Sequence, residues 1–404
     1  MLFERINSIE VYMPLKNFSF SVPTKILFGV NQVCCVGAEA LALGGKKALI
    51  ITDKNIVKVG LVDRVRDQLE EDGLDVDIFD EVEPEPHIEC ANLVTDFIRK
   101  RDSDIFVGVG GGSCLDMTKV ASIMATNPGK VEQYLGKNTI RNLARPKILI
   151  PTTAGTGSEC SSSIVIHMRP GETLKSQGLI MDRKVYADVG IVDPLMSITM
   201  PPRLTANTAF DALSHAIEST MALGSNPMSE ALAFEAIRLV ANNLKKAYYR
   251  GEDLVARYHL AVAASMAIQA ATSGGSSLGH GMQYPLTTHY KTHHGEGCGI
   301  VLPYVMNYNL PLCVDKFAKI AEAMGENING LTLQKAAKKA LYAVIRLLRD
   351  VENPTCLRDM NIPKEDLSML AEECATKYPR PTNVRKATKE DILEIYQDMW
   401  EGKI

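Results

Sequence analysis

The feature that most constrains the fold is a change of hydrophobic periodicity near residue 201. Before Met200-Pro201-Pro202, short apolar runs alternate with segments of helical period, 56–72 and 88–102 among them. This alternation predicts a mostly parallel sheet with helices on both faces. The runs that we interpret as strands are 48–52, 76–79, 104–109, 147–150, 164–166 and 189–192.

After Ala206 the strand signals almost disappear, and apolar residues recur at the 3.6-residue spacing of helices. The segments with this spacing are 207–221, 227–247, 253–273, 315–325, 332–350, 364–376 and 388–399. With 404 residues the chain also exceeds the roughly 250–300 residues that one core serves. We therefore predict an α/β domain over 1–200 and an all-helical domain over 201–404.

Composition excludes several classes of protein. The net charge of −4 and the scattered basic residues give no footprint for nucleic acid or an anionic membrane. The uncharged stretch 260–279 is long enough to span a membrane, but polar residues and the Gly-Gly-Ser-Ser at 274–277 interrupt it, which predicts a buried core helix. Nine cysteines without a C-x-x-C pair, and a start unlike a signal peptide, predict a cytoplasmic protein without a disulfide framework.

Two glycine-containing loops follow predicted strands. The run 104–109 leads into Gly110-Gly111-Gly112-Ser113 and then a predicted helix at 114–125, while 147–150 leads into PTTAGTGSE at 151–159. Glycines at a helix N-terminus let backbone N–H groups approach a phosphate, although tight turns use glycine without any ligand. Two such loops at the ends of parallel strands favour a dinucleotide crevice. Asp53 follows the strand 48–52, where it can accept from a ribose or cap the next helix.

Acidic and histidine residues form a candidate metal site in the second half. Asp211 and His215 are four residues apart on a predicted helix, so they share a face, as many solvated pairs also do. His280 follows the 253–273 helix, and His294 lies in His293-His294-Gly295-Glu296-Gly297. Three nitrogens and one oxygen suit Fe²⁺, Zn²⁺, Co²⁺ or Mn²⁺ better than Mg²⁺ or Ca²⁺.

Longer motifs carry a resemblance to a known family. Four motifs follow one another along the chain: GGGSCLDMTK at 110–119, PTTAGTGSE at 151–159, AFDALSHAIE at 209–218 and GHGMQYPL…HHGEG at 279–297. FSFSVPTKILFG at 18–29 and RPTNVRKATKEDI at 380–392 extend the match to nearly the whole chain. In these motifs the sequence resembles the iron-containing (group III) alcohol dehydrogenases.

The resemblance implies a dehydroquinate synthase-like architecture, with the site between an NAD-binding α/β domain and a helical metal-binding domain. The implied metal ligands are Asp211, His215, His280 and His294. The implied cofactor-binding residues are Asp53, Gly111, Gly112, Ser113, Asp116, Thr152, Thr153 and Lys175. We therefore expect NAD(H), one divalent ion (Fe²⁺ first, Zn²⁺ second) and a homodimer or larger homo-oligomer.

This chain departs from the family pattern at several positions. Many relatives have a histidine where Tyr284 stands, so Tyr284, His289 or His293 is left to pass a proton. Glu85 replaces the asparagine of a common P-N-P turn. At three substrate-pocket positions the chain has small residues, which suit a small or polar substrate or simply close helix packing: Ser163, Ala271 and Ser273.

The resemblance implies an oxidoreductase that interconverts a small primary alcohol and its aldehyde. A narrower form of this prediction is that the substrate carries a polar or anionic group. The ion would polarise the substrate oxygen while the nicotinamide exchanges a hydride. Three alternatives remain open: a glycerol-dehydrogenase-like polyol enzyme, a nucleotide-binding filament subunit, and a dehydroquinate synthase-like lyase. The lyase would need a phosphate-binding cluster of basic residues, and 276–298 offers only Lys291.

Overall fold

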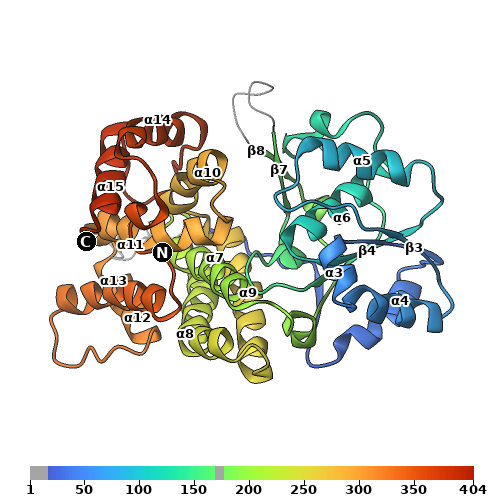
Figure 1. Cartoon of the computed structure of the whole chain (residues 1–404), viewed down its shortest axis with the longest axis horizontal. Coiled ribbons are helices and arrows are strands. Elements are labelled where there is room, and N and C mark those ends of the chain that lie inside the picture. Colours follow the sequence, from blue (N-terminus) through green and yellow to red (C-terminus); the bar gives the residue numbers. More distant parts are fainter. Residues whose placement is uncertain (1–16, 169–176) are drawn as a thin grey trace, which may run out of the picture.

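The computed structural model describes residues 17–168 and 177–404, and Figure 1 shows a sheet with flanking helices beside a body of helices. The main sheet has six strands in the order β1-β9-β6-β4-β2-β3, and all of its pairings are parallel. Its strands are β1 (Lys25–Phe28), β2 (Lys47–Ile51), β3 (Asp75–Phe79), β4 (Ile105–Gly110), β6 (Lys147–Pro151) and β9 (Val189–Val192). The predicted parallel sheet is confirmed.

A smaller sheet lies beside the main one and joins β5 (Gly136–Lys137), β8 (Gln177–Met181) and β7 (Ser163–His167). Here β7 and β8 are antiparallel. The predicted strand 164–166 is therefore present, but it belongs to this second sheet. The sequence did not predict β1, β5 or β8; β5 is only two residues long.

Helices cover both faces of the main sheet, as the alternation predicted. Leu49 and Ile51 of β2 pack in one core with α5 (Ile88–Ile98) and α6 (Gly112–Met124). Ala48 and Ile50 of the same strand pack in another core with α2 (Val36–Ala42) and α4 (Leu61–Glu71). Burial of alternate residues on opposite faces explains why 48–51 of this strand are all apolar. The predicted helix 56–72 is two helices, α3 (Lys54–Lys58) and α4, because Gly60 adopts a positive φ of 76° between them.

From Pro202 the described chain is helical. The helices are α7 (Pro202–Thr220), α8 (Pro227–Tyr249), α9 (Leu254–Gly274), α10 (Leu278–Tyr290), α11 (His294–Asn309), α12 (Val314–Ala323), α13 (Leu333–Asp350), α14 (Leu367–Lys377) and α15 (Lys389–Glu401). Seven of them match predicted helical segments. The helices α10 and α11 were not predicted, and they carry two of the candidate metal ligands.

The helix α9 is apolar and long enough to cross a membrane by length and composition. It packs against α7 and α8, however, and contributes Leu260 and a row of alanines to the helical core. Its fully buried Arg257 donates to Thr205 Oγ1 and to the Met200 carbonyl. α9 is therefore a core helix of the described chain, as the interrupted apolar stretch predicted.

The loop after β6 packs against the helical part. Ala154 of this loop belongs to the hydrophobic core of the helical part. Gly155 lies against the α7 backbone, where an added Cβ would stand 2.7 Å from the Thr208 carbonyl oxygen. A side chain at this position would push the loop away from α7, so glycine sets how closely the two parts approach.

Candidate metal centre

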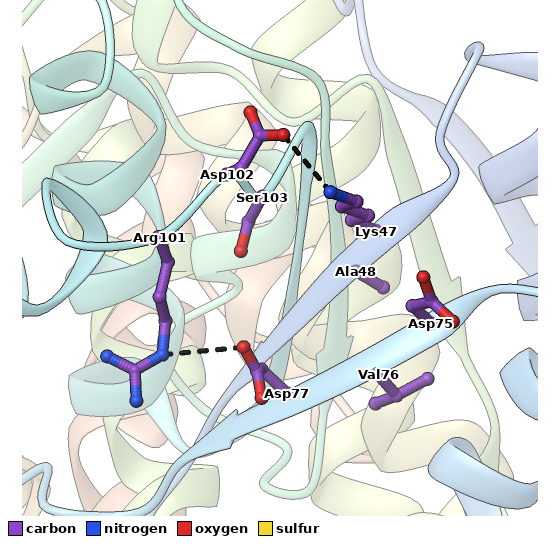
Figure 2. Close-up of a pocket in the computed structure, with 8 residues that line it drawn as sticks. All are labelled: Lys47, Ala48, Asp75, Val76, Asp77, Arg101, Asp102 and Ser103. Atoms are coloured by element: carbon purple, nitrogen blue, oxygen red, sulfur yellow. Dashed lines mark hydrogen bonds and ion pairs between the residues drawn. The ribbon is translucent and has the colours of Figure 1, made fainter.

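A surface hollow of about 250 Å³ lies at the amino edge of the sheet, where β2, β3 and β4 begin (Figure 2). Two exposed ion pairs cross its rim, Lys47–Asp102 at 3.1 Å and Arg101–Asp77 at 3.4 Å. Ligands of open parallel sheets bind outside the carboxyl ends of the strands, which is the opposite edge. This hollow is therefore no candidate for the predicted crevice.

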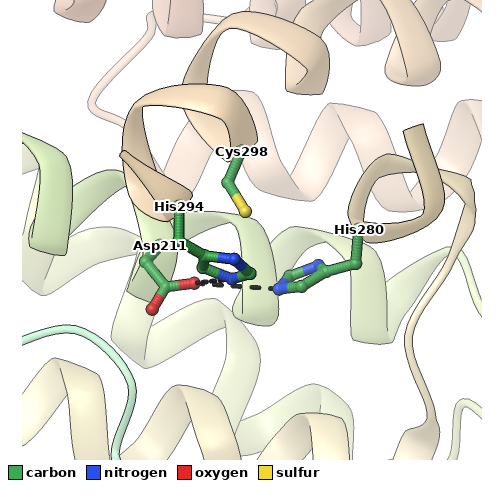
Figure 3. A group of neighbouring side chains, drawn as sticks. All are labelled: Asp211, His280, His294 and Cys298. Carbon is green, nitrogen blue, oxygen red and sulfur yellow. Dashed lines mark ion pairs between the residues drawn. The ribbon is translucent and has the colours of Figure 1, made fainter. Parts of the chain in front are cut away.

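The four predicted metal ligands come together from three helices. Asp211 and His215 lie on α7, His280 lies on α10 and His294 begins α11. Asp211 Oδ1 is 3.7 Å from His215 Nδ1, 3.7 Å from His280 Nε2 and 3.5 Å from His294 Nε2. Figure 3 shows the carboxylate of Asp211 beside the rings of His280 and His294, with Cys298 next to them. Residues 83 positions apart in sequence thus converge on one carboxylate oxygen.

Several of these atoms are buried and have no hydrogen-bond partner. They are Asp211 Oδ1, His215 Nδ1 and His280 Nε2. Buried polar atoms are nearly always hydrogen-bonded, because losing water without a replacement partner is costly. A cation among these atoms would satisfy all of them, and the nitrogen and oxygen donors fit a first-row divalent metal. The residues therefore fit the predicted ion.

The protonation states of Asp211 and His215 suit metal ligands. Burial alone would raise the pKa of Asp211, but the surrounding histidines hold it well below its ordinary value, so it stays a carboxylate. Burial lowers the pKa of His215 to about 4, outweighing the opposite effect of Asp211, so the ring is neutral at pH 7. A carboxylate and a neutral imidazole are the forms that bind metals.

Glu218 orients His280, one of the predicted ligands. Its Oε1 lies 2.7 Å from His280 Nδ1, and its Oε2 accepts from the backbone N–H of Ser277 at 2.9 Å. A carboxylate at Nδ1 keeps a proton there and leaves the Nε2 lone pair free to face Asp211. Similarly, the Gln283 side-chain amide lies 2.7 Å from His294 Nδ1. Sequence reasoning missed both, although Glu218 follows Asp211 by seven residues and so shares its helix face.

Gly295 lets α11 approach α7. A Cβ on this residue would overlap the carbonyl oxygen of Asn207 and stand 3.3 Å from the Asp211 Cβ. The first turn of α11 therefore lies directly on the α7 backbone beside Asp211. This close approach brings His294, the preceding residue, to the carboxylate, and it accounts for glycine in the HHGEG motif.

The two predicted glycine loops lie side by side at the carboxyl edge of the main sheet. The strands β4 and β6 are neighbours, and the backbone N–H of Thr152 donates to the Gly110 carbonyl at 2.9 Å. Gly111 lies against Thr153, since a Cβ on the glycine would stand 3.4 Å from the threonine methyl. The predicted residues Gly112 and Ser113 form the first turn of α6. Loop backbone beside a helix N-terminus is an arrangement that can hold phosphates, and Gly111, Gly112 and Ser113 are half-buried here.

Comparison with known proteins assigns the chain. The family model for iron-containing alcohol dehydrogenase matches residues 23–194, and that for the family's C-terminal part matches 205–400. The chain belongs to the iron-containing alcohol dehydrogenase family. It is an oxidoreductase that interconverts alcohols and aldehydes.

Individual members of the family are similar over almost their whole length. The 1,3-propanediol dehydrogenase of Citrobacter freundii is 38% identical over 387 residues, which cover 95% of this chain and 99% of that protein. The NAD-dependent methanol dehydrogenase of Bacillus methanolicus is 35% identical over 94% of this chain and 99% of that protein. A crystal structure of 1,3-propanediol oxidoreductase matches with a TM-score of 0.92 and 38% identity, over 95% of this chain and 100% of that one.

Within this family member, the Asp116–Lys119 pair of the GGGS-x-x-D-x-x-K motif joins elements together. Asp116 Oδ1 accepts from Ser158 Oγ at 2.6 Å, and its Oδ2 accepts from the Val165 N–H at 2.9 Å. The fully buried Lys119 Nζ donates to Ser158 Oγ at 2.6 Å and to the Ser163 carbonyl at 3.0 Å. Both carboxylate oxygens of Asp116 are thus bound within the protein. The pair connects α6, the second glycine loop and β7.

Asp53 has the helix-capping role that the sequence left open. It is the N-cap of α3, and its Oδ1 accepts from the backbone N–H groups of Asn55 at 2.7 Å and Ile56 at 3.1 Å. Its Oδ2 accepts from Cys114 Sγ at 3.3 Å, which places the carboxylate beside the first turn of α6. Lys175, the other outlying cofactor prediction, lies outside the described residues.

The three candidate proton-transfer residues have different surroundings. The Tyr284 ring lies 5.8 Å from the His294 ring and 5.0 Å from the Tyr378 ring. His289 Nε2 lies 2.6 Å from Glu373 Oε2, and His293 caps α11 through its Nδ1. Tyr284 is thus the one of the three whose ring contacts a predicted metal ligand.

The predicted pocket residues lie on two elements, and Glu85 pairs with a histidine. Ser163 begins β7, and Ala271 and Ser273 lie near the end of α9, where Ser273 Oγ accepts from Asn226 Nδ2 at 3.1 Å. Glu85, with a positive φ of 49°, has its Oε2 2.8 Å from His167 Nε2. The Glu85–His167 pair was not predicted, because its members are 82 residues apart.

Proposed function

We propose that this protein interconverts a small primary alcohol and its aldehyde with NAD(H), using one divalent ion held by Asp211, His215, His280 and His294. The observation that carries the proposal is the convergence of buried, unpartnered donor atoms on Asp211 Oδ1. The names of similar proteins support the reaction class, since one acts on 1,3-propanediol and another is an NAD-dependent methanol dehydrogenase. Family membership favours Fe²⁺, and the donor set also suits Zn²⁺.

When bound, the ion would supply Lewis acidity toward the substrate oxygen. The residues of the chain prepare that site. Glu218 holds a proton on His280 Nδ1 so that Nε2 faces the centre, and Gly295 brings His294 to Asp211. Tyr284, beside His294, is our proposed group for passing the hydroxyl proton toward solvent.

For the dinucleotide, we propose that the two glycine loops bind the pyrophosphate and that Asp53 faces the adenosine ribose. The loop residues in this role are Gly111, Gly112, Ser113, Thr152 and Thr153. Asp116 contributes indirectly, by fixing Ser158 and α6. The negative charge of Asp53 would repel a 2′-phosphate, so NAD(H) is preferred over NADP(H).

For the substrate we propose a short alcohol or aldehyde with a polar or anionic group, next to Ser163, Ala271 and Ser273. The small side chains leave room, and a hydroxyl can bind a polar substituent.

We further propose separate domains at 1–200 and 201–404, a homodimer or larger homo-oligomer, and a cytoplasmic location. Separate hydrophobic cores support the domain boundary, since the buried core of the helical part includes only Ala154 and Met200 from the described residues of 1–200.

The test uses full-length protein reconstituted anaerobically with Fe²⁺ or Zn²⁺. We expect stoichiometric metal and reduction of short aldehydes, followed as loss of NADH absorbance at 340 nm. His280→Ala and His294→Ala should each lose the metal and most turnover, whereas His259→Ala on α9 should retain both. Stoichiometric metal in both ligand variants would refute the site, and turnover with no dependence on metal would refute the reaction.

A further inference from the structure

A cysteine completes the cluster of ligand-type side chains around Asp211. Cys298 Sγ lies with the ligating atoms of Asp211, His280 and His294 in a group whose members are all within 4.8 Å of one another. Cys298 follows His294 by four residues on α11, so both project from one helix face. Figure 3 shows its sulfur directed toward the two imidazole rings.

Two observations separate Cys298 from a cysteine that only packs. Asp211 Oδ1 and His280 Nε2, which face the same space, are buried and unpartnered. In addition, Cys298 is 1% exposed. Among the cysteines of 17–168 and 177–404, Cys298 is the one that lies in a group with three other potential metal ligands. The other buried cysteines of the described chain, such as Cys313 at the start of α12, lie outside that group.

His215 has a different position in the centre. Its Nδ1 is 3.7 Å from Asp211 Oδ1, but its ring is stacked on the His280 ring with centroids 4.5 Å apart, and it is not in the group with Cys298. The structure thus contains two overlapping sets of four donors. Asp211, His280 and His294 belong to both, and the fourth donor is either His215 or Cys298.

We propose that Cys298 is a direct metal ligand, so that the centre can bind through Asp211, His280, His294 and the Cys298 sulfur. This inference rests on the proposed metal site and deepens it. Coordination would release the thiol proton to solvent and bind the thiolate, the form in which cysteine ligates metals. Thiolate is a soft donor, so this set favours Zn²⁺ and Co²⁺ over Fe²⁺, whereas the set with His215 does not discriminate in this way.

The test is the absorption spectrum of full-length protein reconstituted anaerobically with Co²⁺. We expect a near-ultraviolet thiolate-to-cobalt charge-transfer band in the wild type and in His215→Ala. Cys298→Ala and the near-isosteric Cys298→Ser should lose this band, while the matched control Cys313→Ala keeps it. We also expect the Zn²⁺ dissociation constant of Cys298→Ser to rise by about ten-fold or more, with a smaller change for Fe²⁺. Circular dichroism checks that each variant is folded.

The outcomes separate this inference from the metal site itself. Wild-type protein that binds stoichiometric Co²⁺ without the band, or a band that persists in Cys298→Ser, overturns the thiolate ligand and leaves the histidine site standing. Stoichiometric Co²⁺ in His280→Ala overturns the site assignment. The double variant His215→Ala/Cys298→Ser should bind metal more weakly than either single variant, and equal binding by all three would contradict the two overlapping sets.

Discussion

The Asp53 carboxylate has two hydrogen-bonding roles. One oxygen caps α3, and the other accepts from Cys114 beside the first glycine loop. Removing the side chain would change helix stability and local charge together, because an N-cap contributes about 1 kcal/mol. Any cofactor preference measured on such a variant would therefore mix two effects. A substitution that keeps the cap and removes the charge separates them.

Asp53→Asn is that substitution, since asparagine caps helices as well as aspartate does. We expect kcat/KM for NADPH to rise relative to that for NADH by about ten-fold, which is about 1.4 kcal/mol, with the melting temperature almost unchanged. Steady-state kinetics with both cofactors give the ratio. Asp63→Asn, on the exposed face of α4, is the charge-matched control and should leave it unchanged. A wild-type enzyme that already prefers NADPH would contradict the role of Asp53.

The sequence predicted individual site residues unevenly, for a physical reason. Asp211 and His215 are visible as a pair because an i, i+4 spacing fixes their relative position on a helix. His280 and His294 could be assigned through the motifs around them. Glu218, Gln283 and Cys298 reach the candidate ligands because α7, α10 and α11 pack closely together. No local spacing in the sequence encodes how closely three helices pack.

At the scale of elements, α10 and α11 were missed because their sequences look unlike helices. Each contains an internal proline, Pro285 in α10 and Pro303 in α11, and both are rich in glycine. These residues disfavour isolated helices. In the structure their glycines allow close contact, as Gly281 does against the Tyr378 carbonyl and Gly295 against Asn207. Tertiary packing therefore outweighs local propensity in these two helices.

This explanation predicts an unusual result for Gly295→Ala. Alanine at an open helical position would stabilise by roughly 0.5–1 kcal/mol, but here the methyl group would overlap the Asn207 carbonyl. We expect unfolding to become easier by about 1–3 kcal/mol. Because α11 would move from α7, metal affinity should also fall by about ten-fold or more. Denaturant unfolding and chelator competition measure the two effects.

The comparison for this variant is Gly190→Ala in β9, where the added methyl would meet Glu159 at an ordinary contact distance of 3.4 Å. It should retain the metal. If Gly295→Ala instead gains stability and binds metal normally, then α11 has room to move, and the close approach to α7 does not position His294.

For the whole molecule, the candidate centre is a junction of three helices within one part. Its proposed ligands lie on α7, α10 and α11, whereas the sheet contributes none. The sheet side meets these helices through the loop after β6, where Ala154 enters the helical core and Gly155 lies on α7. The metal should therefore stabilise the helical part directly and the sheet only indirectly, through contacts such as this loop.

Removing the metal should consequently change the two parts unequally. A ligand present at a thousand times its dissociation constant stabilises the state that binds it by about 4 kcal/mol. We expect hydrogen–deuterium exchange in chelated protein to speed up most in α10 and α11, whose glycine-rich sequences depend on packing. The first turn of α7 and the 152–158 loop should respond less, and β2, β3 and α4 should not respond. Exchange should return to its original rate when Zn²⁺ or Fe²⁺ is restored anaerobically, and a uniform acceleration over both parts would show instead that the ion supports the fold as a single unit.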